Sequence, residues 1–263
     1  MMENKIILIT ENLSIGYSHK KGIMPIASNI HITLKEGKLI ALVGANGIGK
    51  STLLRTLTGI KRPLAGNVAL HDKNISDYNT LQLAREMSVV LTEKLPPTNL
   101  TVFELVALGR QPYTNWIGKL SPEDLSKIND AIELTQIGHL CNKKHYEISD
   151  GQLQKVLIAR ALAQDTALIV LDEPTTHLDL LHKVSLFQLL KKLTQESGKC
   201  ILFSTHDIDL AIQLSDGMIV MTEGITVQGA PRQLIEDGVF DTLFDDENLR
   251  FDTAKGKFIF RNL

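Results

Sequence analysis

The chain has 263 residues, of which 43% are hydrophobic and 22% are charged, and its formal net charge is −2. This composition supports a packed core and excludes an intrinsically disordered chain. Charges of both signs are mixed along the sequence, so no long basic stripe indicates a nucleic-acid partner, and we expect none. The two cysteines, Cys141 and Cys200, are too few for a disulfide framework or a metal-ligand cluster. We expect buried or half-buried thiols in a reducing compartment.

No targeting or membrane-spanning segment is evident. The N-terminal apolar run is shorter than that of a secretory signal, and no run approaches the roughly 20 apolar residues that span a bilayer. We therefore expect a cytoplasmic protein whose membrane association depends on a partner.

In chain order, short segments at 6–12, 27–34 and 67–70 predict an antiparallel β layer around a first buried strand at 39–43. Further buried parallel strands are predicted at 167–171 and 200–204. Amphipathic periodicity predicts helices at 50–58, 152–163 and 182–196. In such open α/β sheets, ligands gather at the carboxyl ends of the strands, where this sequence places its polar clusters.

A block at 93–146 has a helical pattern and is predicted to be an inserted helical subdomain. Thr101 is a candidate cap for a helix at 101–109, and Ser121 begins a second predicted helix at 121–137. We assign 1–92 and 147–230 to the core and 231–263 to a C-terminal tail, in which the alternation at 249–261 suggests a hairpin.

A glycine-rich turn joins the strand at 39–43 to the helix at 50–58 and fits the pattern G-x-x-x-x-G-K-[ST]. It consists of Gly44, Ala45, Asn46, Gly47, Ile48, Gly49, Lys50, Ser51 and Thr52. The glycines let backbone N–H groups face phosphate oxygens, and the helix N-terminus adds its dipole. Lys50 would bring a positive charge to the β- and γ-phosphates, and the Ser51 hydroxyl would ligate Mg²⁺. The turn predicts ATP binding within an α/β fold of the P-loop NTPase class.

Two further clusters follow buried strands. Asp172, after the strand at 167–171, would hold Mg²⁺, and Glu173 would activate the attacking water as a general base. His206, after the strand at 200–204, would meet the γ-phosphate or that water. Taken singly, two loop acids or one histidine have structural explanations. Their place beside the phosphate loop favours a catalytic function.

With these motifs, the chain resembles the ATP-binding subunits of ABC transporters along nearly its whole length. Ile148, Ser149, Asp150, Gly151 and Gln152 are similar to the Leu-Ser-Gly-Gly-Gln signature of that family. Thr176, His177, Leu178 and Asp179 resemble its D-loop, and Tyr17 matches the aromatic residue that stacks on adenine.

The resemblance implies an α/β core with an antiparallel β subdomain and a helical subdomain, and hydrolysis of ATP with Mg²⁺. It also implies a homodimer in which the signature of one subunit covers the nucleotide bound by the other. The homodimer would act on two membrane-spanning permease subunits, and indirectly with a substrate-binding protein, at the cytoplasmic side of the cell (inner) membrane.

Two residues depart from the family pattern. Asp150 stands where the signature has its first glycine, and Glu93 stands where the Q-loop has glutamine. Glu93 can still ligate Mg²⁺ but has no amide donor. We expect ATPase activity to be retained with altered coupling or metal dependence. A Glu93→Gln variant with unaltered ATPase rate and Mg²⁺ dependence would contradict this expectation.

The segment after the Q-loop ends in Gly109, Arg110, Gln111 and Pro112 and resembles importers of iron–siderophore, haem and cobalamin complexes. In that subfamily, residues 95–110 would form part of the groove that docks the permease. Alternatively, the segment is an ordinary helix followed by a Gly/Pro break, and the similarity to these importers is fortuitous. A soluble ABC ATPase of iron–sulfur assembly, translation or DNA repair is an alternative. The chain lacks the second cassette of the translation type and the coiled coil of the repair type. A catalytically silent nucleotide-binding module is disfavoured because the motif residues are all present.

Overall fold

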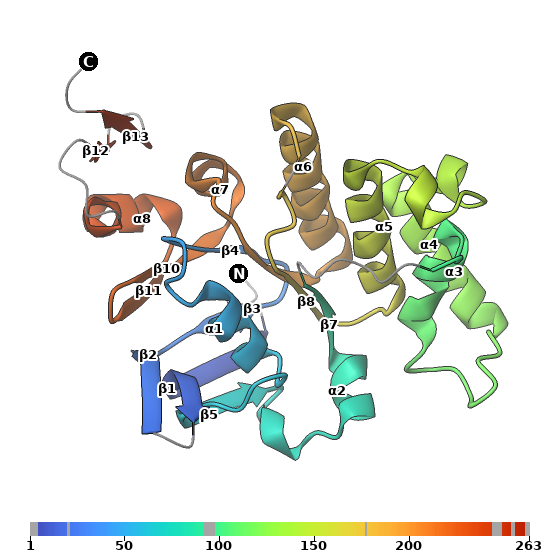
Figure 1. Cartoon of the computed structure of the whole chain (residues 1–263), viewed down its shortest axis with the longest axis horizontal. Coiled ribbons are helices and arrows are strands. Elements are labelled where there is room, and N and C mark those ends of the chain that lie inside the picture. The colour runs from blue at the N-terminus through green and yellow to red at the C-terminus, as the bar shows by residue number, and fades with distance from the viewer. Residues whose placement is uncertain are drawn as a thin grey trace.

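The computed structural model describes residues 5–19, 22–91, 98–176, 178–243, 249–253 and 256–260, and it confirms the predicted α/β fold class (Figure 1). A six-stranded sheet forms its centre. The strands are β4 (Leu39–Gly44), β7 (Met87–Val90), β8 (Leu168–Leu171), β9 (Cys200–Ser204), β10 (Gly217–Thr222) and β11 (Ile225–Gly229). Their spatial order is β11-β10-β4-β9-β8-β7.

Every neighbouring pair from β10 to β7 is parallel, and only β11 runs antiparallel. The carboxyl ends of β4, β9 and β8 therefore lie side by side, as the positions of the polar clusters require. The strands predicted at 39–43, 167–171 and 200–204 are confirmed as β4, β8 and β9.

The antiparallel layer is a second sheet, in which β1 is central. Its strands are β1 (Ile6–His19), β2 (Gly22–Ile30), β3 (Thr33–Lys35), β5 (Ala65–Leu70) and β6 (Lys73–Asn74). The single strand predicted at 27–34 is wrong, because β2 ends at Ile30 and β3 begins at Thr33. The buried Thr10 hydroxyl donates to the Ile30 carbonyl at 3.0 Å and accepts from the Ile32 N–H at 2.9 Å. These bonds stabilise the break, after which β3 pairs with another part of β1.

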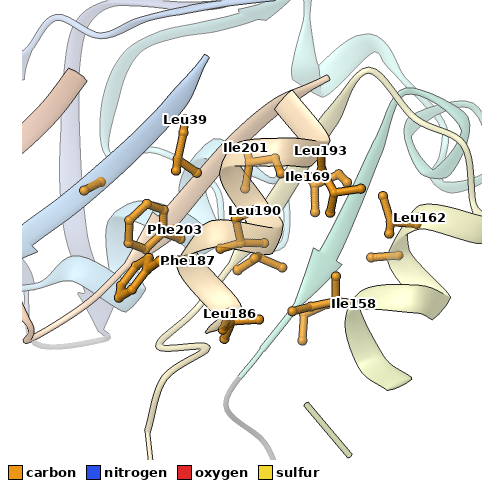
Figure 2. Close-up of a cluster of buried hydrophobic side chains, with 14 of the residues drawn as sticks. Leu39, Ile158, Leu162, Ile169, Leu186, Phe187, Leu190, Leu193, Ile201 and Phe203 are labelled. Atoms are coloured by element: carbon orange, nitrogen blue, oxygen red, sulfur yellow. The ribbon is translucent and has the colours of Figure 1, made fainter. Parts of the chain in front are cut away.

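The six-stranded sheet separates two hydrophobic cores because its side chains alternate between its faces. In β4, Ile40 and Leu42 pack into the core shared with the antiparallel sheet and α1 (Lys50–Leu57). Leu39, Ala41 and Val43 face the other core, together with α5 (Asp150–Ala163) and α6 (Leu180–Ser197). Figure 2 shows side chains of α5 and α6 meeting those of the strands in this second core. The predicted helices at 50–58, 152–163 and 182–196 are confirmed as α1, α5 and α6.

The helical block contains α3 (Val102–Ala107), η2 (Leu108–Arg110), α4 (Pro122–Thr135), η3 (Gly138–Leu140) and η4 (His145–Glu147). Both predicted caps form: Thr101 and Ser121 each accept a bond from the N–H three residues on and make a full capping box. The block lies beside α5, away from the antiparallel sheet (Figure 1). Its boundaries at 93 and 146 as a subdomain remain a prediction.

Asp165 ties this block to the sheet. Its carboxylate lies 2.7 Å from Lys127 Nζ of α4 and 2.9 Å from Lys199 Nζ, next to the start of β9. Burial raises the pKa of Asp165, but the hydrogen bonds and charges of both lysines outweigh burial and hold that pKa at about 2. The carboxylate therefore stays ionised and links two parts of the chain.

The remaining described elements are α2 (Thr80–Glu86), η1 (Ile75–Asp77), α7 (Ile208–Leu214), α8 (Pro231–Glu236), η5 (Val239–Thr242), β12 (Leu249–Asp252) and β13 (Lys257–Phe260). The last two pair antiparallel, which confirms the predicted terminal hairpin. Both cysteines are free thiols, with Cys200 buried and Cys141 partly buried, as expected. Within the described ranges, no helix combines the length and the apolar character needed to cross a membrane.

Candidate functional site

The glycine-rich turn lies between the end of β4 and the first residue of α1. At Gly44, a Cβ would come within 2.6 Å of the Met221 carbonyl oxygen of β10. Gly49 has a φ of 111°, and a Cβ there would lie 2.5 Å from the Ile26 side chain. Both positions thus need glycine, and the tight turn leaves the N-terminus of α1 without a side-chain cap. Free N–H groups and the helix dipole at this end suit an anion.

Lys50 lies inside the turn. It is 5% exposed, and its Nζ donates to the carbonyl oxygens of Gly44 at 2.8 Å and Ala45 at 3.1 Å. Burial lowers the pKa of this ammonium, and the negative charges of Glu173 and Asp172 oppose that shift. The cation is therefore held between the loop and two carboxylates, where it can neutralise phosphate oxygens.

Asp172 and Ser51 meet at one point. Asp172 Oδ1 accepts hydrogen bonds from Ser204 Oγ at 2.7 Å and from Ser51 Oγ at 3.3 Å. Hard oxygen donors of this kind fit Mg²⁺, which takes one or two protein ligands and completes its octahedron with phosphate oxygens and water. Among the described residues, no group of three or more histidine, cysteine or acidic side chains could hold a metal ion. Glu93, the third predicted ligand, lies outside the described residues.

Glu173 and His206 are in direct contact. Glu173 Oε1 lies 2.6 Å from His206 Nε2, and its Oε2 accepts a bond from Thr176 Oγ1 at 3.1 Å. The backbone of Glu173 is left-handed, with a φ of 49°, and its N–H donates to Ser204 Oγ at 2.8 Å. Two neighbouring strands, β8 and β9, thus supply a carboxylate and an imidazole whose geometry suits acid–base chemistry.

These side chains line one cavity of about 250 Å³. Its walls are Tyr17, Ile26, Asn46, Gly47, Gly49, Lys50, Ser51, Thr52, Glu173 and His206. Tyr17 is 43% exposed, its hydroxyl lies 3.3 Å from Thr52 Oγ1, and Lys61 Nζ lies 3.3 Å from the ring centroid. The structure therefore brings the predicted adenine-stacking residue, the phosphate loop and the predicted base and histidine together.

The signature residues Ser149, Asp150, Gly151 and Gln152 do not line this cavity. Ser149 caps α5: its Oγ accepts from the Gln152 N–H at 3.3 Å, and Gln152 Oε1 accepts from the Ser149 N–H at 3.0 Å. Asp150 is exposed on the first turn. The signature is thus built as a helix N-terminus open to solvent.

Leu178 of the predicted D-loop lies next to Gly151 of the predicted signature. A Cβ on Gly151 would meet Leu178 Cδ2 at 3.3 Å. Asp179 caps α6 by accepting from the His182 N–H at 2.9 Å, and the same carboxylate lies 2.8 Å from His182 Nδ1. His177, part of the predicted D-loop, lies outside the described residues.

Sequence reasoning did not assign a role to Ser204. This fully buried hydroxyl donates to Asp172 and accepts from the Glu173 N–H, so it orders both carboxylate residues. Nearby, Asp207 accepts bonds from Thr175 Oγ1 at 3.0 Å and Lys183 Nζ at 2.8 Å, which fixes the loop after β9 to that after β8. In the sequence, Ser204 is recognisable only as a polar residue at the end of a buried strand. This pattern is common and does not indicate which groups the hydroxyl would bond to.

The phosphate loop, the carboxylate pair and the histidine at adjacent strand ends define a P-loop nucleotide-binding protein. A family model described as ABC transporter matches residues 27–176, and the chain belongs to this family. It is an ABC ATPase that binds ATP and hydrolyses it.

Curated relatives cover most of the chain. An uncharacterized ABC transporter ATP-binding protein of Methanocaldococcus jannaschii is 38% identical over 97% of this chain and 87% of its own length. The iron(3+)-hydroxamate import ATP-binding protein of Bacillus subtilis is 38% identical over 90% of this chain and 87% of its own length. The achromobactin transport ATP-binding protein of Dickeya dadantii is 37% identical over 90% and 87%.

Solved structures agree with the fold. The cbiO1 subunit from Clostridium perfringens, part of the ABC transporter complex cbiONQ, superposes with a TM-score of 0.77 at 30% identity, over 89% of this chain and 92% of that one. An ATP-binding cassette solved as a dimer in a post-hydrolysis state with ADP and Pi superposes with a TM-score of 0.73 at 28% identity, over 86% of this chain and 99% of that one.

Proposed function

We propose that this chain is the ATP-hydrolysing motor of an importer for iron–siderophore complexes or a related chelate such as haem or cobalamin. The convergence of Lys50, Glu173 and His206 in one cavity carries the hydrolytic part of the proposal. The transport part is supported by the relatives named for achromobactin transport and iron(3+)-hydroxamate import. The segment Gly109 to Pro112 supports it as well.

ATP binds across this cavity. Tyr17, which is 43% exposed at the cavity, stacks on adenine, and the N–H groups of the turn surround the phosphates. Lys50 exchanges its contacts with the Gly44 and Ala45 carbonyls for phosphate oxygens. Ser51 and Asp172, with Glu93 as a proposed further ligand, would hold Mg²⁺, which when bound neutralises and orients the phosphate oxygens.

Glu173 is the general base. It takes a proton from a water molecule as the water oxygen bonds to the γ-phosphorus, and the bond from that phosphorus to the β,γ-bridging oxygen breaks, leaving ADP and phosphate. His206, 2.6 Å from Glu173, orients the carboxylate and contacts the γ-phosphate. Thr176 holds the second carboxylate oxygen, so the base has a defined direction.

Each cavity is half of a complete site. The signature residues Ser149 to Gln152 form an exposed helix N-terminus, in which Ser149 and Gln152 cap each other. The N–H groups of Asp150 and Gly151 suit a γ-phosphate presented by a second copy. The dimeric cassette with ADP and Pi supports this arrangement. Asp150 adds a carboxylate at this contact, which is favourable at a helix N-terminus and leaves the backbone N–H available when the side chain points to solvent.

The homodimer works beneath two membrane-spanning permease subunits, at the cytoplasmic face of the cell membrane. A substrate-binding protein acts indirectly through the permease.

Reconstitution with the copurifying permease tests the transport proposal. We expect a binding protein loaded with an iron–siderophore, haem or cobalamin to stimulate ATP hydrolysis in the reconstituted complex, and the same protein without cargo to stimulate it less. Lack of stimulation by all three loaded proteins, together with copurification in a soluble complex, would contradict an importer and favour an assembly ATPase.

A further inference from the structure

The segment Gly109 to Pro112, which resembles that of chelate importers, is followed by Tyr113, and the five residues together have a structural role that the resemblance does not supply. They lie between α3 and α4 and contact three other parts of the fold: α5, α4 and α2. These contacts converge on the end of α5 opposite to the signature.

Gly109 allows η2 to touch the backbone of α5. A Cβ at this position would lie 2.2 Å from the Arg160 carbonyl oxygen and 3.2 Å from the Ala163 side chain. Backbone atoms within a helix cannot move aside cheaply. Glycine is therefore required here for close approach, and the contact fixes η2 against the last turn of α5.

Arg110 adds directed hydrogen bonds to this contact. Its side chain is 5% exposed, and its Nε donates to Asp124 Oδ1 at 2.8 Å while its Nη1 donates to the Ala163 carbonyl at 2.8 Å. Ala163 is the last residue of α5, where carbonyl groups lack helical partners and a cation is favourable. Asp124 belongs to the capping box that begins α4. One guanidinium thus joins the end of α5 to the start of α4.

Tyr113 and Arg85 connect this junction to the core. The guanidinium of Arg110 lies 4.0 Å from the Tyr113 ring centroid, and that of Arg85, on α2, lies 5.3 Å from it. Arg85 also donates two bonds to the Pro112 carbonyl, at 3.0 and 2.9 Å. The ring is thus in contact with one cation from each side of the junction.

The residue that follows α5 makes a second connection to the core. Gln164 Nε2 donates to the Ala84 carbonyl at 2.6 Å and to the Met87 carbonyl at 3.0 Å, at the end of α2 and the start of β7. The C-terminal end of α5 is therefore fixed both to α4 and to the sheet that carries the phosphate loop.

We propose that Gly109, Arg110 and Tyr113 are positioning residues that set the direction of α5 and so place the signature against the second nucleotide. α5 has 14 residues and is therefore about 20 Å long. A tilt of about 5° at the held end moves the signature end by roughly 2 Å. A misplacement of about 1 Å at a reacting centre can lower a rate by about 100-fold. The inference rests on the proposed function, in which the signature acts on the partner's nucleotide.

The test uses the full-length purified chain with the variants Arg110→Lys and Tyr113→Leu. Lysine keeps the charge but lacks the planar guanidinium, whose Nε and Nη1 bond to Asp124 and Ala163 in fixed directions, and leucine removes the aromatic face. Tyr113→Phe keeps that face and is the conservative rescue. Arg232→Lys is the matched control, because Arg232 lies on α8 with its side chain 91% exposed.

We expect Arg110→Lys and Tyr113→Leu to lower kcat for ATP hydrolysis about tenfold or more, while the Kd for ATP at the phosphate loop changes less than about twofold. Tyr113→Phe and Arg232→Lys should keep the parent kcat. In the Glu173→Gln background, Arg110→Lys should raise the Kd of the ATP-dependent dimer, measured by sedimentation, by about tenfold.

An unchanged kcat in both variants would overturn the inference, and so would a proportional loss of kcat, ATP affinity and Tm, which indicates a merely structural role. If Arg110→Lys does not fold, the Tyr113→Leu variant alone tests the inference. Tyr113 is partly exposed, so its replacement should be tolerated by the fold. A Glu173→Gln chain that never dimerises with ATP would overturn the two-subunit site itself. A Glu173→Gln dimer that Arg110→Lys leaves unweakened would overturn only the positioning role.

Discussion

Replacing Glu173 by glutamine removes the proposed base and preserves its shape. The amide oxygen can still accept from Thr176, and the amide group can still reach His206 across 2.6 Å, so the loop keeps its geometry. What is lost is the ability to take a proton from water. A positioned general base contributes about 10²- to 10⁴-fold to a rate. We therefore expect kcat to fall by this factor, which corresponds to about 3–5 kcal/mol of transition-state free energy.

ATP binding should survive this change because Lys50 keeps its hydrogen bonds to the turn and the turn keeps its backbone conformation. Steady-state hydrolysis gives kcat, and equilibrium binding of ATP gives Kd for the same preparation. Glu236→Gln is the matched control, since Glu236 forms an exposed ion pair with Arg232 on α8, and it should behave as the parent. Ordinary turnover in Glu173→Gln would refute the assignment of the base. Loss of ATP binding would show that Glu173 is needed to build the cavity.

Other expectations concern the supports of the site and the fold. Ser204→Ala removes the buried bond to Asp172 and the bond from the part-buried Glu173 N–H, so the free energy of unfolding in urea should fall by about 2 kcal/mol and kcat should fall with it. Asp165→Asn removes two ion pairs. Because the folded pKa of this partly exposed carboxylate is depressed to about 2, the variant should lose about 1 kcal/mol after allowance for solvent screening. That difference is fully present above about pH 4 and vanishes as the pH falls towards 2, which urea unfolding across this range would show. Burial raises the pKa of Cys200 to about 12, so in a Cys141→Ser variant a thiol reagent at pH 8 should react only after denaturation. Tyr17→Ala should weaken ATP binding by about 1 kcal/mol, and Tyr17→Phe should not, as equilibrium binding would reveal.

Features set by neighbouring residues could be predicted from the sequence. The strand at 200–204 and the capping boxes at Thr101 and Ser121 depend on residues close along the chain. The phosphate loop could likewise be predicted, because the residues that shape it, such as Gly49 and Lys50, are neighbours in the sequence. The position of Asp172, Glu173 and His206 at the same edge of the sheet could be predicted because the carboxyl ends of parallel strands lie at one edge.

Features set by distant contacts could not be predicted. The break between β2 and β3 depends on the Thr10 hydroxyl of β1. The role of Ser204 depends on β8 lying beside β9, which the order of strands along the chain does not give. The role of Arg110 depends on three-dimensional proximity to Asp124 and to the end of α5. In each case one polar group meets partners from another element.

Mixed dimers test most directly whether the signature of one copy completes the site of another. Lys50→Ala inactivates the phosphate loop, and Ser149→Arg obstructs the signature, so each variant alone should be inactive. If the site is shared, a dimer of one copy of each holds one intact site, and a 1:1 mixture should recover about a quarter of the parent ATPase rate. A mixture as inactive as its components, with mixed dimers shown to form, would contradict a site built from two copies of this chain.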